Sequence, residues 1–186
     1  MEASTSGSAP SRWRSGLYGA LIMLGVVVLV PLIVAATGII SVSAQGSPGL
    51  IDAFLDFAST QSIAFHAPAG KNPFAEDTVA IAEALPHYKE MCVVCHSAPG
   101  LERSEIAEGL HPDPPDLASE DSQELSDGQI FWLITNGITS TGMPAFEKAD
   151  DADTRWKIVS FVRHLPHLTD AERTQLQEEG EKQGDD

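Results

Sequence analysis

The stretch Cys92-Val93-Val94-Cys95-His96 decides how this chain folds, because C-x-x-C-H is the attachment signal for c-type haem. The two thiols would form thioether bonds to the haem vinyl groups, and His96 would give the iron its proximal imidazole. The chain has two cysteines, and both belong to this motif. A redox dithiol or a plain disulfide needs no histidine at that position, and a zinc site would need a second Cys/His pair at finger spacing. The motif therefore predicts one covalently bound haem c.

A second stretch offers the iron a ligand on the other side of the haem. From Asn136 to Phe146 the sequence reads NGITSTGMPAF, and its glycines and proline predict a shaped loop rather than a helix. Met143 in this loop can present its thioether sulfur at a fixed point. The other methionines start the chain, lie in an apolar run, or directly precede the cysteine motif. The alternative is that Met143 fills a gap in the core. Ligation by His96 and Met143 would raise the reduction potential and suit electron transfer.

The segment from about His87 to Pro166 resembles a class I cytochrome c domain. The resemblance rests on the C-x-x-C-H motif, on Pro114-Pro115-Asp116-Leu117, on Gly142-Met143-Pro144 and on a last helix that ends at Leu165-Pro166. It implies an all-α cytochrome c fold, with three to five short helices around one covalent haem. In related cytochromes the carbonyl of a proline in a P-x-L loop accepts a hydrogen bond from the proximal histidine. Pro115 matches that proline, although the neighbouring prolines could merely stiffen the loop.

The amino-terminal part has the composition of a membrane element. Arg12 and Arg14 precede an apolar run over residues 17–36, and no charged residue occurs between Arg14 and Asp52. Such a run can span a bilayer as a helix, with the arginines in the cytoplasm. We expect a single-pass protein of a bacterial cytoplasmic membrane, with its haem domain on the periplasmic or outer side. The alternative is a signal peptide cleaved near residues 42–44, which would leave a soluble periplasmic protein.

The sequence predicts five segments. They are a disordered cytoplasmic tail (residues 1–14), a transmembrane anchor or signal segment (15–40), a linker with a short amphipathic helix over residues 50–58 (41–76), a cytochrome c haem domain (77–168) and a charged tail (169–186). In the haem domain, a helix should start at Asp77 or Thr78 and run towards Cys92. It should bend or restart at Pro86, since proline disrupts a helix interior.

Two later helices have clear end signals. Ser126 and Gln129 form a capping box, and Gly137 can take the left-handed conformation that ends a helix. The last helix should run from about Asp153 to Leu165 and end at Pro166. Its apolar residues recur at i, i+3, i+4 and i+7, which predicts one buried face.

The charge of the chain bears on its partners. With 27 acidic and 11 basic residues the formal net charge is −16. Such a surface is repelled by nucleic acid, and it either favours a partner with a basic docking patch or merely keeps the protein soluble. A six-coordinate iron leaves no place for a small-molecule substrate, so we predict an electron carrier and not an enzyme. Its partners would be respiratory or photosynthetic redox proteins, such as a membrane oxidoreductase or oxidase complex of which it could be a haem subunit.

Two alternatives remain open. A haem enzyme or gas sensor would require Met143 to be absent from the iron or easily displaced. A carrier with two histidine ligands would instead use one of the remaining candidates, which are His66, His87, His111, His164 and His167.

Overall fold

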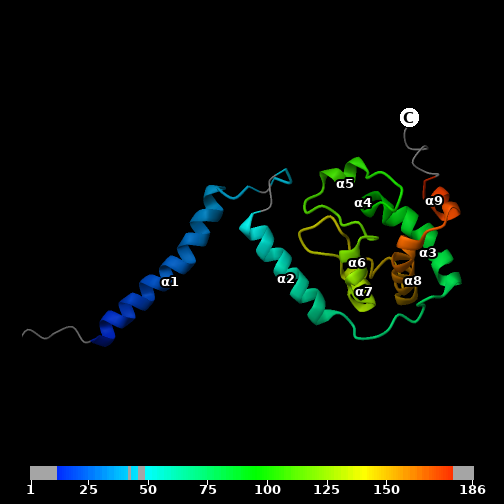
Figure 1. Cartoon of the computed structure of the whole chain (residues 1–186). Coiled ribbons are helices and arrows are strands. Elements are labelled where there is room, and N and C mark those ends of the chain that lie inside the picture. The colour runs from blue at the N-terminus through cyan, green and yellow to red at the C-terminus, as the bar shows by residue number, and fades with distance from the viewer. Residues whose placement is uncertain (1–11, 42, 46–48, 178–186) are drawn as a thin grey trace, which may run out of the picture. The chain divides into compact units, whose positions relative to one another are not determined.

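The computed structural model describes residues 12–41, 43–45 and 49–177, and every regular element in these ranges is a helix (Figure 1). The chain divides into two compact units, residues 1–43 and residues 44–186. The all-α fold class predicted from the sequence is confirmed.

The first unit is built on one helix, α1 (Arg12–Thr37). It is apolar and long enough to cross a membrane, a property that a signal sequence near the amino terminus shares. The helix begins before the expected residue 15, because Trp13 and Arg14 are acceptable helix formers that continue it outward. Residues 1–11 of the expected tail, and residue 42 of the alternative cleavage site, lie outside the described residues.

The second unit contains the remaining helices. They are α2 (Leu50–His66), α3 (Thr78–Met91), α4 (Val93–His96), α5 (Glu105–Gly109), α6 (Glu120–Glu124), α7 (Asp127–Asn136), α8 (Ala152–His164), the 3-10 helix η1 (Leu165–His167) and α9 (Asp170–Gln177). The short helix expected after Leu50 extends to His66. The expected charged tail begins with α9, whose Leu176 is buried; residues 178–186 lie outside the described residues.

The packing of α3 against α8 forms the centre of the core (Figure 1). Ala84 presents a small side chain to this contact, and Tyr88 and Phe161 are completely buried with ring centroids 5.0 Å apart. The hydroxyl of Tyr88 donates to the carbonyl of Ser97 at 2.8 Å. Burial raises the pKa of Tyr88 above its ordinary value, so the phenol stays a neutral donor.

Helix α3 does not restart at Pro86, contrary to one of our expectations, and is continuous from Thr78 to Met91. Proline removes one backbone donor, but the helix is held at both sides of that position. Asp77 caps it by accepting from the backbone N–H groups of Val79 and Ala80 at 2.9 and 3.2 Å. Beyond Pro86, the burial of Tyr88 on α8 fixes the last turns, so tertiary packing outweighs the proline.

The predicted end signals of α7 are confirmed. Ser126 Oγ accepts from the backbone N–H of Gln129 at 3.2 Å, and the Gln129 side chain accepts from the Ser126 N–H at 2.8 Å. Gly137 ends the helix with φ of 64°. Helix α8 starts at Ala152, with Asp151 as its cap, and Pro166 converts its end into η1 because a ring at that position still fits the first turn of a 3-10 helix.

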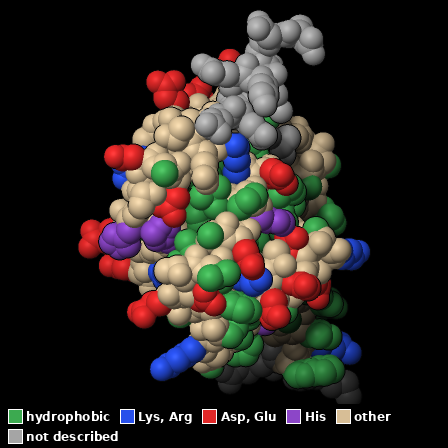
Figure 2. Space-filling view, turned by 90° about the vertical axis from the view of Figure 1, so that its right-hand side faces the viewer, with side chains coloured by type: hydrophobic (Ala, Val, Ile, Leu, Met, Phe, Trp, Pro, Cys, Tyr) green, Lys and Arg blue, Asp and Glu red, His purple; other side chains and the backbone are tan. Residues whose placement is uncertain are grey.

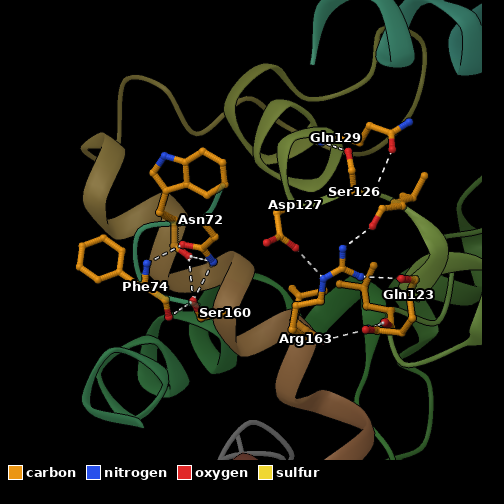
Figure 3. A network of polar contacts seen from close by, with 12 residues as sticks. Asn72, Phe74, Gln123, Ser126, Asp127, Gln129, Ser160 and Arg163 are labelled. Atoms are coloured by element: carbon orange, nitrogen blue, oxygen red, sulfur yellow. Dashed lines mark hydrogen bonds and ion pairs between the residues drawn. The ribbon is translucent and has the colours of Figure 1, made fainter. Parts of the chain in front are cut away.

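The segment between α2 and α3 is fastened to α8 (Figure 3). The buried Asn72 side chain donates to Ser160 Oγ at 2.8 Å and to the Trp156 carbonyl at 3.2 Å, and it accepts from the Phe74 N–H at 2.9 Å. These bonds tie residues 72–74 to the middle of the core.

A second polar network holds the residues before and at the start of α7 (Figure 3). Arg163 on α8 pairs with Asp127 at 2.8 Å and donates to the backbone carbonyls of Gln123, at 2.6 Å, and Leu125. The Gln123 side chain donates to the carbonyls of Leu117 at 2.7 Å and Val162 at 2.9 Å. Helix α8 therefore positions the chain that runs from Leu117 to Asp127.

Candidate haem site

The junction of α3 and α4 brings the three motif residues to one cavity. Cys92 ends α3 by donating its N–H to the Tyr88 carbonyl at 2.9 Å, and its own carbonyl accepts from His96 N–H at 2.9 Å. This tight turn directs Cys92, Cys95 and His96 into the same cavity. The i, i+3 spacing of the cysteines puts both sulfurs on one side of the turn.

The cavity is large and mostly aliphatic. Its space, counted together with the open solvent at its mouth, is about 1180 Å³. Its apolar walls come from the loop after α5 and from α7 and α8, and include Leu117, Leu125, Ile130, Ile134, Ile158 and Val162. Such walls can surround a macrocycle and exclude water from it.

His96 is oriented by the loop that contains Pro115. Its Nδ1 lies 2.9 Å from the Pro115 carbonyl oxygen, which only accepts, so Nδ1 carries the proton and Nε2 is free. Burial lowers the pKa of His96 below its ordinary value, although the bond to Pro115 opposes the shift. A neutral imidazole with a free Nε2 is the form that binds a metal.

The loop around Pro115 is itself fixed. The Asp116 carbonyl accepts from the hydroxyls of Ser119 at 2.7 Å and Ser122 at 2.8 Å, and the Asp116 carboxylate accepts from the Ala118 N–H at 2.8 Å. With Gln123 bonded to the Leu117 carbonyl, the acceptor for His96 cannot move easily.

Met143 lies on the connection between α7 and α8 and lines the same cavity. Its N–H donates to Thr141 Oγ1 at 3.1 Å, and the Phe146 N–H donates to the Ile134 carbonyl at 3.1 Å, so the loop is closed back onto α7. Gly137 permits this path: a Cβ there would lie 2.6 Å from the Met143 carbonyl oxygen. The loop thus holds Met143 half-buried at a set position.

Two other residues that border the cavity, Met91 and His87, have side chains of a kind that can bind iron. Met91 is 45% exposed and directly precedes Cys92 in the chain. His87 lies one helical turn earlier, and its Nε2 is 3.1 Å from an Asp150 carboxylate oxygen. From the sequence, His87 could be predicted only as an alternative ligand. The sequence contains no signal for the pair with Asp150, because the two residues lie far apart in the chain.

All six histidines are among the described residues, and of these His87 and His96 line the cavity. His66 stacks on Trp132 with ring centroids 6.0 Å apart, and His164 lies 3.1 Å from Glu172. Two of the five alternative histidine ligands therefore make contacts outside the cavity.

The thiol chemistry disfavours a redox dithiol. Burial raises the pKa of Cys92 to about 12, so almost no thiolate forms at neutral pH. Reactive dithiols depend instead on a lowered thiol pKa. Two thiols, a neutral imidazole and a thioether around one aliphatic cavity fit a covalently attached haem.

Comparison with known families agrees with this site. Residues 79–162, somewhat less than half of the chain, match the family described as cytochrome c oxidase, cbb3-type, subunit III. A search of curated proteins finds no match. The chain contains a class I c-type cytochrome domain, which is an electron-transfer domain with covalently bound haem c.

Proposed function

We propose that this protein is a membrane-tethered one-electron carrier. Cys92 and Cys95 would attach the haem, and His96 and Met143 would bind its iron. The observation that carries the proposal is that His96, at the end of α4, and Met143, on the loop between α7 and α8, line one cavity and are each held by hydrogen bonds. When bound, the haem supplies an iron that changes its charge by one electron.

The surrounding residues favour electron transfer over catalysis. The Pro115 carbonyl holds the His96 ring, and the turn around Thr141 holds Met143, so neither ligand has to move when the iron changes charge. Six-coordinate iron would leave no open position for a substrate. The aliphatic walls keep water from the iron and favour the high potential of His/Met ligation.

The location and partners follow from the rest of the chain. As an uncleaved anchor, α1 would keep Arg12 and Arg14 in the cytoplasm and the haem domain on the periplasmic side of a bacterial membrane. The family description supports a membrane oxidase or a related oxidoreductase as the redox partner, or as the complex of which this chain is a haem subunit. The net charge of −16 favours a basic docking patch on that partner.

The absorption spectrum of the purified ferric holoprotein, extended into the far red, tests the ligand assignment. We expect a low-spin spectrum with a weak sulfur-to-iron charge-transfer band, and loss of that band in Met143→Ala with the haem still attached. A matched Met143→His variant should stay low-spin without the band and have a lower potential.

Other spectra would contradict the proposal in distinct ways. A low-spin spectrum without the band in the unaltered protein would favour a second histidine, and His87 is the one whose side chain borders the cavity. A high-spin spectrum would favour the haem enzyme or gas sensor.

A further inference from the structure

Helix α2 has an apolar surface that points away from its own domain. None of its residues, all of which the structure describes, is buried. Leu50 is 91% exposed, Phe65 83%, Phe54 67% and Phe57 63%. An exposed patch of this kind normally marks contact with a lipid or protein surface.

The opposite side of α2 is the one that packs on the haem domain. Ser59 and Ile63, one turn apart, are half-buried, and His66 stacks on Trp132 of α7. At 100° per residue, Ser59 and Ile63 project on the side opposite Phe54 and Phe57. The phenylalanines of this helix therefore face away from the domain, whereas an ordinary surface helix turns its large apolar residues towards the core.

The charged residues of α2 lie on the side away from the phenylalanines. Asp52 and Asp56 project with Ser59, and the helix has no lysine or arginine. A helix that places phenylalanines on one side and carboxylates on the other suits the boundary between acyl chains and water. Without basic residues it suits a zwitterionic lipid rather than an anionic one.

A short segment, residues 38–49, joins α1 to α2. Helix α1 ends at Thr37 and α2 begins at Leu50, with no charged residue in between. Even fully extended, residues 38–49 reach only about 40 Å. If α1 spans the membrane, the first residue of α2 therefore lies within about 40 Å of the end of α1.

We propose that α2 lies along the lipid–water interface, with Phe54, Phe57 and Phe65 inserted among the acyl chains. Through the contact of α2 with α7, this would fix the orientation of the haem domain at the membrane surface. The inference rests on the membrane anchorage proposed above but not on the identity of the iron ligands.

Single spin labels on the full-length holoprotein test this. Both native cysteines are consumed by haem attachment, so an added cysteine is a unique labelling site. The variants are Phe57→Cys, Asp56→Cys as the control at an exposed position on the side of the carboxylates, and Ala35→Cys in α1. Each is placed in phosphatidylcholine vesicles, and its collisions with oxygen and with a water-soluble nickel chelate are measured by electron paramagnetic resonance.

We expect the label at position 57 to collide severalfold more with oxygen, relative to the chelate, than the label at position 56. Equal ratios at the two positions, or a ratio typical of water at position 57, would overturn the proposal. A surface that is covered by a protein partner instead of lipid would give this result, because no partner is present in the vesicles. The label at position 35 reports separately whether α1 is in the bilayer. Haem absorbance checks that each variant is folded and loaded.

Discussion

At the scale of single residues, the two candidate ligands are held by backbone atoms of neighbouring loops. His96 depends on the Pro115 carbonyl, and Met143 depends on the turn that Gly137 opens. Substitutions at these supporting positions should therefore change the ligation of the iron, although the residues His96 and Met143 themselves are kept. Groups that hydrogen-bond to metal ligands commonly affect the affinity and reactivity of a metal site nearly as much as the ligands do.

Gly137→Ala should displace Met143. The residue has φ of 64°, and its Cβ would meet the Met143 and Pro144 backbone at 2.6 to 2.8 Å. Backbone cannot yield as a flexible side chain does, so we expect the far-red band of the ferric protein to weaken while the haem stays attached. Gly109→Ala is the control, because its Cβ would meet nothing within 4 Å. An unchanged band in Gly137→Ala would contradict the role given to this loop.

Tyr88→Phe should destabilise the holoprotein by about 1–3 kcal/mol, because it leaves the buried Ser97 carbonyl without its donor. The ring is retained, so packing against Phe161 is unchanged. Denaturant unfolding followed by circular dichroism measures the loss. A variant as stable as the parent protein would show that water replaces the phenol there.

The residues that could be predicted from sequence are those whose roles depend on neighbours in the chain. Cys92, Cys95 and His96 form one motif, and the loop around Met143 is visible from its glycines and proline. The His87–Asp150 pair could not be predicted, since it depends on how α3 meets the segment before α8. The family match supports the haem domain, while the individual ligands stay predictions.

At the scale of elements, α8 organises the haem domain. One side packs on α3, and its polar residues fasten two separate segments, at Asn72 and at residues 123–127 (Figure 3). The chain around the cavity is therefore held by a helix that contributes few residues to it.

Arg163→Gln should lower the free energy of unfolding by about 1–3 kcal/mol, because it removes donors from two backbone carbonyls and separates α8 from Asp127. Lys157→Gln on the same helix is the control. Its pair with Glu83 is more exposed, so it should change stability by less than about 1 kcal/mol. Equal losses in chemical denaturation would show that the network around Arg163 contributes no more than a surface pair.

The cap of α8 should make stability depend on pH. The hydrogen bond from the Thr154 N–H, 2.7 Å long, is the main cause that lowers the pKa of Asp151 below its ordinary 3.8. In acid the unfolded chain then takes up the proton first, so stability is lost as the pH falls through about 4 and below. Asp151→Asn keeps an acceptor but cannot titrate. The difference in stability between the two proteins should be present at neutral pH and shrink in acid; a constant difference would exclude this linkage.

Helix ends could be predicted where a local motif sets them, as Ser126 and Gln129 do for α7. The continuity of α3 through Pro86 could not, because burial of Tyr88 against α8 outweighs the local effect of proline. The extension of α2 to His66 could not be predicted either; its last residue stacks on Trp132 of α7, which is distant in the sequence.

At the scale of the whole molecule, the dominant property is negative charge. The formal net charge is −16. On the face in Figure 2, acidic side chains are spread across the surface, with lysine and arginine side chains between them. A field of this sign attracts cationic partners before contact and acts on the rate of encounter more than on the fold.

Ionic strength should therefore change the electron-transfer rate in opposite directions for oxidants of opposite charge. The screening length shrinks from about 30 Å at 0.01 M to about 10 Å at 0.1 M ionic strength. Raising the salt should slow oxidation of the ferrous protein by a cationic cobalt complex, because attraction is screened. It should speed oxidation by ferricyanide, because repulsion is screened. Stopped-flow measurement of both second-order rate constants over this range gives the two slopes. If oxidation by ferricyanide also slowed, a local basic patch at the haem would dominate over the net charge, and the docking patch on the natural partner would then be acidic.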